Sequence, residues 1–190
     1  MRVALKIVAV VVVGTLLGLA ITWLSIYRPG WGGAVSDGPW QTSLDVGSKD
    51  AGIIERARVA VHGLLALNRQ ETIYYSTSVD SDGGALSGAC TYQLTGRDPP
   101  ARWWSITAYG SDDFLIPNAA NRYSVSVNTV ARRADGSFTL ILSKANGGVN
   151  WIPVGEDRFS LSLRLYNPGK AVTADPAHVL LPTITRGTCG

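Results

Sequence analysis

The stretch WWSITAYGSDDFLIPNAANRYSVSV, residues 103–127, indicates that this chain folds around β-strands. Its two ends, residues 103–109 and 123–127, are rich in β-branched and aromatic side chains, which are typical of strands. In the second of these runs, apolar side chains alternate with serine, and this alternation predicts a sheet with one buried face. The polar connection at 110–122 is longer than a hairpin turn requires, and such connections often carry function.

The same alternation with a period of two recurs along the body of the chain. It is clearest at residues 159–165, where four apolar side chains fall on one face and polar side chains fall on the other. Further strands are predicted at residues 71–77, 90–94 and 138–142, and turn-forming Asp and Gly residues separate them. This many antiparallel strands joined by short turns implies a mainly β fold, either a sandwich or a barrel.

Residues 48–68 carry the period of an amphipathic helix instead. Ser48 or Asp50 can cap its start. The apolar side chains at helical spacing are Ile54, Ala57, Val61, Leu64 and Leu65. We therefore expect one N-terminal helix packed against the β-sandwich.

Residues 7–27 form an uncharged apolar run, and Arg2 and Lys6 precede it. A helix of this length spans about 30 Å, the thickness of a bilayer's hydrocarbon core. The preceding basic residues favour a cytoplasmic N-terminus for a single transmembrane helix. A cleavable signal peptide is the alternative, with residues 18–20 as a tolerable cleavage site. The apolar run continues past Ala20, which favours an uncleaved anchor.

The predicted organisation is a membrane anchor at residues 1–28, a linker at 29–47 and a β-sandwich domain at 48–190. The aromatic residues Trp23, Tyr27 and Trp31 stand where an interfacial belt would lie. With either an anchor or a signal peptide, the domain lies outside the cytoplasm.

Cys90 and Cys189 are the two cysteines of the chain. Outside the cytoplasm an even number of cysteines favours a disulfide, which would tie the end of the chain to a strand. In the chain-entropy model, closing a loop of about 100 residues stabilises the fold by at most roughly 4.7 kcal/mol. The alternative is a pair of free thiols too far apart to join.

Several short segments occur in an order that carries a family resemblance. They are GLLALN (63–68), ETIY (71–74), the stretch 103–127, DGSFTL (135–140), NWIP (150–153), and RLY (164–166) followed by Pro168. In this order they resemble the uncharacterised bacterial family known as domain of unknown function 1214, from about Ser48 to the end of the chain. The resemblance implies a jelly-roll β-sandwich and transfers no catalytic residue. Many members also carry a second domain, domain of unknown function 1254, for which this chain shows no counterpart. In a bacterium, the predicted anchor places the domain in the periplasm, on the outer side of the inner membrane.

Charge and motifs argue against several classes of function. From Ser48 onward the chain carries 14 basic and 12 acidic side chains, a balance too even and scattered for a nucleic-acid surface. The sequence contains neither G-x-S-x-G nor H-E-x-x-H, and His62 and His178 have no partner at metal-ligand spacing. The adjacent carboxylates at 112–113 and 156–157 point apart in an extended segment. We therefore predict no catalytic residues, no metal ligands and no cofactor.

A possible ligand-binding surface combines amide, guanidinium and indole groups on or beside the polar connections. Its residues are Asn118, Asn121, Arg122, Asn150, Trp151 and Arg164. Aromatic rings together with such hydrogen-bonding groups suit a carbohydrate. Each residue also has a structural interpretation, because Asn caps turns, Arg pairs with carboxylates and Trp packs under corners.

Three functions therefore stay open. The leading hypothesis is a membrane-anchored, periplasmic module that binds a glycan or another ligand of the cell envelope. The second is a structural or interaction subunit that partners a separately encoded protein with domain of unknown function 1254. The third is a hydrolase whose carboxylates come from different strands and converge about 5 to 10 Å apart.

Overall fold

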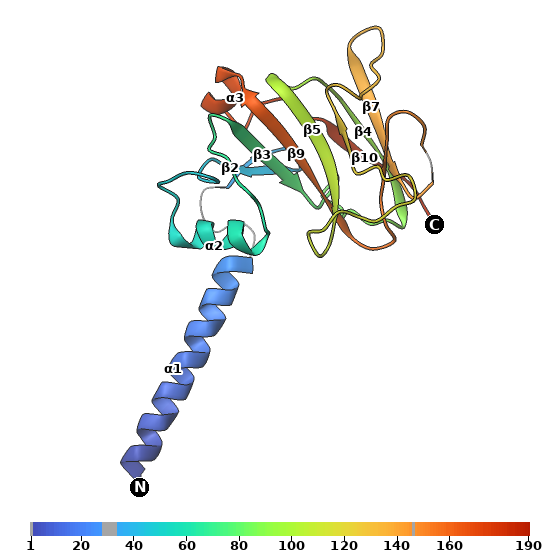
Figure 1. Ribbon diagram of the computed structural model, residues 1–190. Helices are drawn as coiled ribbons and strands as arrows, with labels where there is room; N and C mark the ends of the chain where they lie inside the picture. The colour runs from blue at the N-terminus through green and yellow to red at the C-terminus, as the bar shows by residue number, and fades with distance from the viewer. Residues whose placement is uncertain (1, 28–33, 146) are drawn as a thin grey trace.

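The computed structural model describes residues 2–27, 34–145 and 147–190, which form a long N-terminal helix and a β-sandwich (Figure 1). The helices are α1 (Arg2–Tyr27), α2 (Ile53–Val61) and α3 (Lys170–Ala174). The strands are β1 (Ala34–Asp37), β2 (Trp40–Ser43), β3 (Thr72–Thr77), β4 (Cys90–Arg97), β5 (Ala101–Gly110), β6 (Ser124–Ser126), β7 (Ser137–Ser143), β8 (Trp151–Pro153), β9 (Phe159–Pro168) and β10 (Thr183–Cys189). The prediction of a mainly β fold is confirmed.

The strands form two sheets. One has six strands in the order β1-β2-β3-β9-β5-β6, and the other has four in the order β10-β4-β7-β8. Within the described residues every ladder is antiparallel except that of β7 and β8, which is parallel. In that parallel ladder, Ile141 of β7 pairs with Trp151 of β8.

The core lies between the two sheets. All four apolar side chains predicted to share one face of β9 are buried in it: Phe159, Leu161, Leu163 and Leu165. From β5 and β7, Trp104 and Phe138 stack with 5.1 Å between their ring centroids. Burying each such side chain stabilises the fold by about 1.5–3 kcal/mol, so alternation along the central strands holds the sheets together.

The N-terminal part of the sandwich differs from the prediction. Residues 34–43, expected to belong to the linker, form β1 and β2 and extend the six-stranded sheet. Trp40 is fully buried, and its indole N–H donates to the carbonyl of Pro182 at 2.8 Å. The linker prediction failed here because this burial depends on a residue 142 positions away. Residues 28–33, which include Arg28, Trp31 and the first part of the predicted linker, lie outside the described residues.

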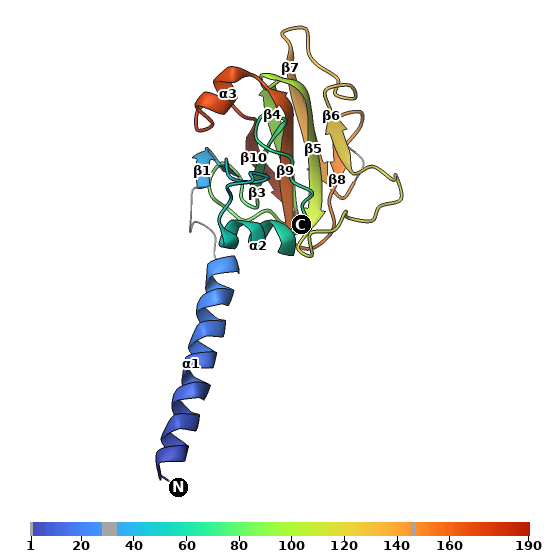
Figure 2. The same cartoon turned by 60° about the vertical axis from the view of Figure 1, so that its left-hand side comes forward.

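The soluble helix α2 is also shorter than the helix predicted at residues 48–68, and it does not pack against the sandwich core as predicted. It ends after Val61, and Gly63 follows with a φ of +62°, the left-handed conformation that commonly terminates helices. No residue of α2, a helix that the structure describes in full, is buried. α2 therefore does not pack into the sandwich core, and Figure 2 shows it at the base of the sandwich, at the end of α1.

The predicted disulfide is present and joins Cys90 on β4 to Cys189 on β10. It closes a sequence separation of 99 residues and ties the C-terminus to the four-stranded sheet. A disulfide fits an extracytoplasmic location. By length and composition, α1 is apolar enough to cross a membrane, and none of its apolar window is buried in the protein.

Candidate functional site

The predicted binding residues on the long connection after β5 organise a turn. The side-chain amide of Asn118 donates to the carbonyls of Ile116 and Arg122, and its oxygen accepts the backbone N–H of Arg122. Asn121 lies inside this turn with a φ of 48°, a conformation that asparagine tolerates better than most residues. The amide of Asn118 is thus used to close the turn that precedes β6.

Arg122 reaches from this turn to the other sheet. Its guanidinium donates to the carbonyl of Val149, just before β8. There the side chain of Asn150 exchanges two hydrogen bonds with the backbone of Ala131, at 2.7 and 2.6 Å. Trp151 is buried, and its indole N–H donates to the carbonyl of Ser143 at 3.0 Å.

The structure therefore brings Asn118, Arg122 and residues 149–151 together where β6 and β8 end the two sheets. The amide groups of Asn118 and Asn150 and the indole of Trp151 bond to their own chain. Ligand binding at this edge stays a prediction.

Arg164 lies apart from that edge, on the outer face of the six-stranded sheet. On β9 it stands between Tyr74 of β3 and Ser105 of β5, so that β5 separates it from β6. Its guanidinium donates to the hydroxyl of Thr107 at 3.2 Å and to that of Tyr109 at 2.6 Å. The guanidinium carbon also lies 5.5 Å from the centroid of the Tyr109 ring, within range of a cation–π interaction.

The outer face around Arg164 carries aromatic rings and hydroxyl groups, of which those of Thr72, Ser105 and Thr107 are buried. Trp103 and Tyr166 meet edge to face, with 5.2 Å between their ring centroids. Register and alternation place the following further residues on this face: Thr72, Tyr74, Ser76, Ser105, Thr107, Tyr109, Ser160 and Ser162. We call Tyr74, Trp103, Tyr109, Arg164 and Tyr166 the aromatic face. Of these, only Arg164 is among the ligand-binding residues predicted from the sequence. The available signal for the others was their alternation with the buried residues of the same strands.

The segment between α2 and β3 borders the aromatic face. The hydroxyl of Tyr74 accepts the backbone N–H of Leu67 at 3.1 Å. At the start of the segment, Nδ1 of His62 lies 2.8 Å from a carboxylate oxygen of Asp113, in the loop after β5. These contacts link the segment to β3 and to the loop that follows β5.

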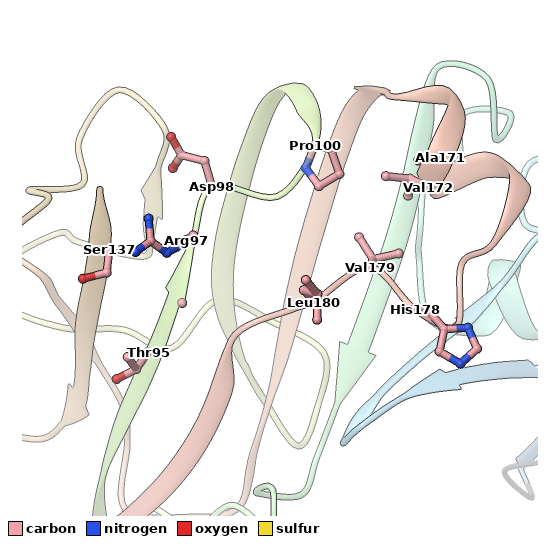
Figure 3. A pocket seen from close by; sticks show the side chains of 11 residues that line it. Thr95, Arg97, Asp98, Pro100, Ser137, Ala171, Val172, His178, Val179 and Leu180 are labelled. Atoms are coloured by element: carbon pink, nitrogen blue, oxygen red, sulfur yellow. The ribbon is translucent and has the colours of Figure 1, made fainter. Parts of the chain in front are cut away.

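A hollow of about 620 Å³ lies at the end of the sandwich that carries α3 (Figure 3). Its lining residues include Thr95, Arg97, Asp98, Pro100, Val172, His178, Val179 and Leu180. Figure 3 shows Thr95, Arg97 and Asp98 on the β4 side and Val172, Val179 and His178 on the α3 side. Volumes of this order are typical of small-molecule sites. Leu180 is 90% exposed and has a left-handed φ of 57°.

The charged side chains of this hollow already have partners. Arg97 pairs with Asp135 at 3.5 Å, and Asp98 pairs with Arg132 at 2.9 Å. The hydrogen bond to Asp175, together with its negative charge, raises the pKa of His178 above the ordinary histidine value. The charged groups of the hollow thus serve ion pairs of the fold.

Three of the carboxylates considered for hydrolysis, Asp112, Asp113 and Glu156, are separately engaged. Asp112 accepts the backbone N–H of Phe114, and Asp113 contacts His62. Glu156 pairs with Lys144 at 2.9 Å, and the hydrogen bond from Lys144 lowers the pKa of this carboxyl. Among residues 2–27, 34–145 and 147–190, no group of three or more His, Cys, Asp or Glu side chains could hold a metal ion.

Comparisons with known proteins agree with the predicted resemblance. The family described as "Protein of unknown function (DUF1214)" matches residues 71–170. No curated protein matches the chain. The crystal structure of the VPA0106 protein from Vibrio parahaemolyticus is similar over 73% of this chain, with 27% identity and a TM-score of 0.62, and the chain covers 36% of that protein. An uncharacterised protein from Burkholderia cenocepacia is similar over 63% of this chain and 30% of its own, with 17% identity and a TM-score of 0.43.

Proposed function

We propose that this chain, which belongs to the DUF1214 family, is a membrane-tethered extracytoplasmic module that binds a glycan of the cell envelope on its aromatic face. The aromatic face lies entirely within residues 71–170, the region that carries the family match. The scaffold we assign to it is a β-sandwich of the jelly-roll type, which the family resemblance implies.

The observation that carries the proposal is the position of Arg164. A guanidinium held by Thr107 and Tyr109 in the middle of aromatic and hydroxyl side chains is a fixed, charged hydrogen-bond donor. Aromatic rings such as Trp103 offer flat apolar surfaces with limited conformational freedom, which suit the apolar face of a sugar ring. The face therefore combines the two kinds of contact that a carbohydrate requires.

The charge of the aromatic face indicates which class of glycan would bind there. Among the outward residues of β3, β5 and β9 assigned above, Arg164 carries the charge and none is acidic. A guanidinium pairs strongly with carboxylate or phosphate. We therefore favour an acidic glycan over a neutral or cationic one.

The proposed membrane tether rests on α1, and the proposed extracytoplasmic location rests on the disulfide. The 26 residues of α1 are long and apolar enough to span a bilayer, and the Cys90–Cys189 bond suits an oxidising compartment. We propose an uncleaved anchor with a cytoplasmic N-terminus and a periplasmic domain at the bacterial inner membrane. A reporter fused after Gly190 should be active only on the outer side of that membrane.

Binding can be tested with the full chain in detergent micelles, passed over an immobilised polymer of uronic acid and over a neutral glucan. Arg164→Ala should reduce affinity for the acidic polymer about ten- to hundredfold, because a hydrogen bond to a charged group contributes about 1.5–3 kcal/mol. Arg133→Ala is the matched control, since the guanidinium of Arg133 donates to the hydroxyl of Thr139 on the four-stranded sheet, away from the aromatic face, and this variant should bind as the wild type does. Equal retention of Arg164→Ala and the wild type, with unchanged melting temperatures, would contradict the proposal.

A second candidate function is that of an interaction subunit. It is favoured by the match to the VPA0106 protein, of which this chain covers only 36%. The larger part of that protein has no counterpart in the match, and a separately encoded protein with domain of unknown function 1254 would be the partner. A stable complex of the two proteins in size-exclusion chromatography with light scattering would support this function.

A further inference from the structure

Helix α2 lies across the end of α1. The guanidinium of Arg58 donates to the carbonyl of Ser25 at 2.7 and 3.2 Å. Ser25 belongs to the last turn of α1, where carbonyls have no partner within the helix and the helix dipole favours a cation. Both views show α2 running crosswise at this end (Figures 1 and 2). A charged contact therefore fixes α2 at the point where α1 ends.

The side of α2 that meets α1 is flanked by exposed apolar residues. At 100° per residue, Ile54 and Val61 lie four positions before and three positions after Arg58, and therefore on the same stripe. They are 37% and 47% exposed. On the opposite side, Arg56 donates to the carbonyls of Lys49 and Ala51. The apolar stripe thus faces the side of α1 and not the sandwich.

Two more exposed apolar side chains lie near the C-terminal end of α2. Leu65, just beyond α2, is 94% exposed, and Phe114, in the loop after β5, is 73% exposed. The contact between His62 and Asp113 ties that loop to the end of α2. Both views show the loop at the α2 end of the sandwich. We call Ile54, Val61, Leu65 and Phe114 the apolar seat.

We infer that the apolar seat inserts into the headgroup region of the bilayer that α1 crosses, so that α2 lies flat on the outer surface of the membrane. This inference rests on the anchor in the proposed function. Trp23 and Tyr27, whose ring centroids are 5.4 Å apart, mark the aromatic level of that interface on α1. An amphipathic helix held at that level and lying crosswise to the span meets lipid on its apolar side.

Lipid is favoured over a protein partner because the apolar seat lies next to the end of α1. A bilayer surrounds the emerging end of α1 on every side, so an apolar surface next to that end contacts lipid without any further binding event. The consequence is a fixed orientation. The end of the sandwich with α3 and the hollow points away from the membrane, as it lies farther from α1 in both views.

The test uses the full chain in lipid nanodiscs of phosphatidylcholine and phosphatidylglycerol. Both native cysteines are engaged in the disulfide, so a single introduced cysteine can carry an environment-sensitive fluorophore. Leu65→Cys and Phe114→Cys report on the seat. Leu180→Cys is the matched control, because Leu180 is another leucine that is 90% exposed and it lies at the hollow, far from α1.

Labels at Leu65 and Phe114 should be quenched by lipids brominated near the headgroup and should be several-fold less accessible to aqueous iodide than the label at Leu180. A label at Val12→Cys, in the middle of α1, separately reports whether α1 spans the disc by its quenching with deeply brominated lipid. If Val12 is quenched while Leu65 and Leu180 respond alike to iodide, the seat is refuted and the anchor stands. If Val12 is not quenched, the anchor and the seat both fail.

Discussion

Replacing Trp40 by alanine tests whether residues 34–43 belong to the folded domain. Trp40 is fully buried and its indole N–H bonds to Pro182 at 2.8 Å. A buried Trp removes about 200 Å² from water, which corresponds to about 5 kcal/mol at ~25 cal/mol per Å², and measured Trp→Ala losses are about 3–5 kcal/mol. For a domain of this size each kcal/mol shifts the melting temperature by about 2–4 °C. We expect Trp40→Ala to melt about 6–20 °C below the wild type.

The assay is thermal unfolding of the full chain in detergent micelles, without reductant, followed by near-ultraviolet circular dichroism. Trp40→Phe retains a buried ring but loses part of the packed indole, and it also leaves the carbonyl of Pro182 unpaired, which by itself costs about 1–3 kcal/mol. Trp23→Ala is the control, since Trp23 lies on α1 with 60% of its surface exposed, and it should leave the domain's melting unchanged. If Trp40→Ala melts within about 2 °C of the wild type, the hairpin of β1 and β2 is not part of the cooperative fold.

Two further predictions concern the disulfide and an ion pair. Reducing the bond between Cys90 and Cys189 should destabilise the domain by up to roughly 4.7 kcal/mol, because it closes a sequence separation of 99 residues. The measurement is urea unfolding of the wild type with and without reductant. The control is Cys189→Ser, whose unfolding midpoint should not respond to reductant. A wild-type midpoint that reductant leaves unchanged would contradict the predicted stabilisation by the disulfide. The pKa of His178 should lie above its ordinary value of 6.5, owing to the hydrogen bond and charge of Asp175. Because this pKa is raised in the folded state, the stabilisation is fully present below pH 6.5 and is lost as the pH rises through the folded value. An NMR titration should show the pKa of His178 falling in Asp175→Asn, and equal values in both proteins would count against the pair.

The sequence predicts the parts of this fold that depend on local pattern. Alternation along β9 identified the buried leucines because a strand with one buried face must alternate. The position of Trp40 was missed because its burial depends on a distant part of the chain, whereas the early end of α2 follows from Gly63, a local signal that the helical periodicity outweighed. Local propensity does not encode that Arg58 meets Ser25 or that Trp40 meets Pro182.

The candidate site was also only partly predictable, because its assembly depends on long-range strand pairing. Arg122 and Arg164 were both expected at one surface because each precedes or lies in a strand with an apolar alternate face. Their separation follows from the strand order β9-β5-β6, which places a whole strand between β9 and β6. Strand order in a sandwich is a property of long-range pairing. The aromatic character of the outer face, by contrast, was readable from the residues that alternate with the core.

The aromatic face and the apolar seat are joined by one segment of chain. Residues 62–67 leave α2 and reach β3, where the hydroxyl of Tyr74 bonds to the backbone of Leu67. Two strands away in the same sheet, the contact of His62 with Asp113 holds this segment to the loop after β5. A segment fastened at both of these points moves with the sheet, so a seat held in the lipid surface also fixes the direction in which the aromatic face is presented. Arg164 stands on β9, in the interior of that sheet. A tether through α1 alone would leave the domain free to rotate about the anchor. The contact of α2 with the end of α1 and with the membrane surface removes this rotational freedom and fixes the direction in which Arg164 faces.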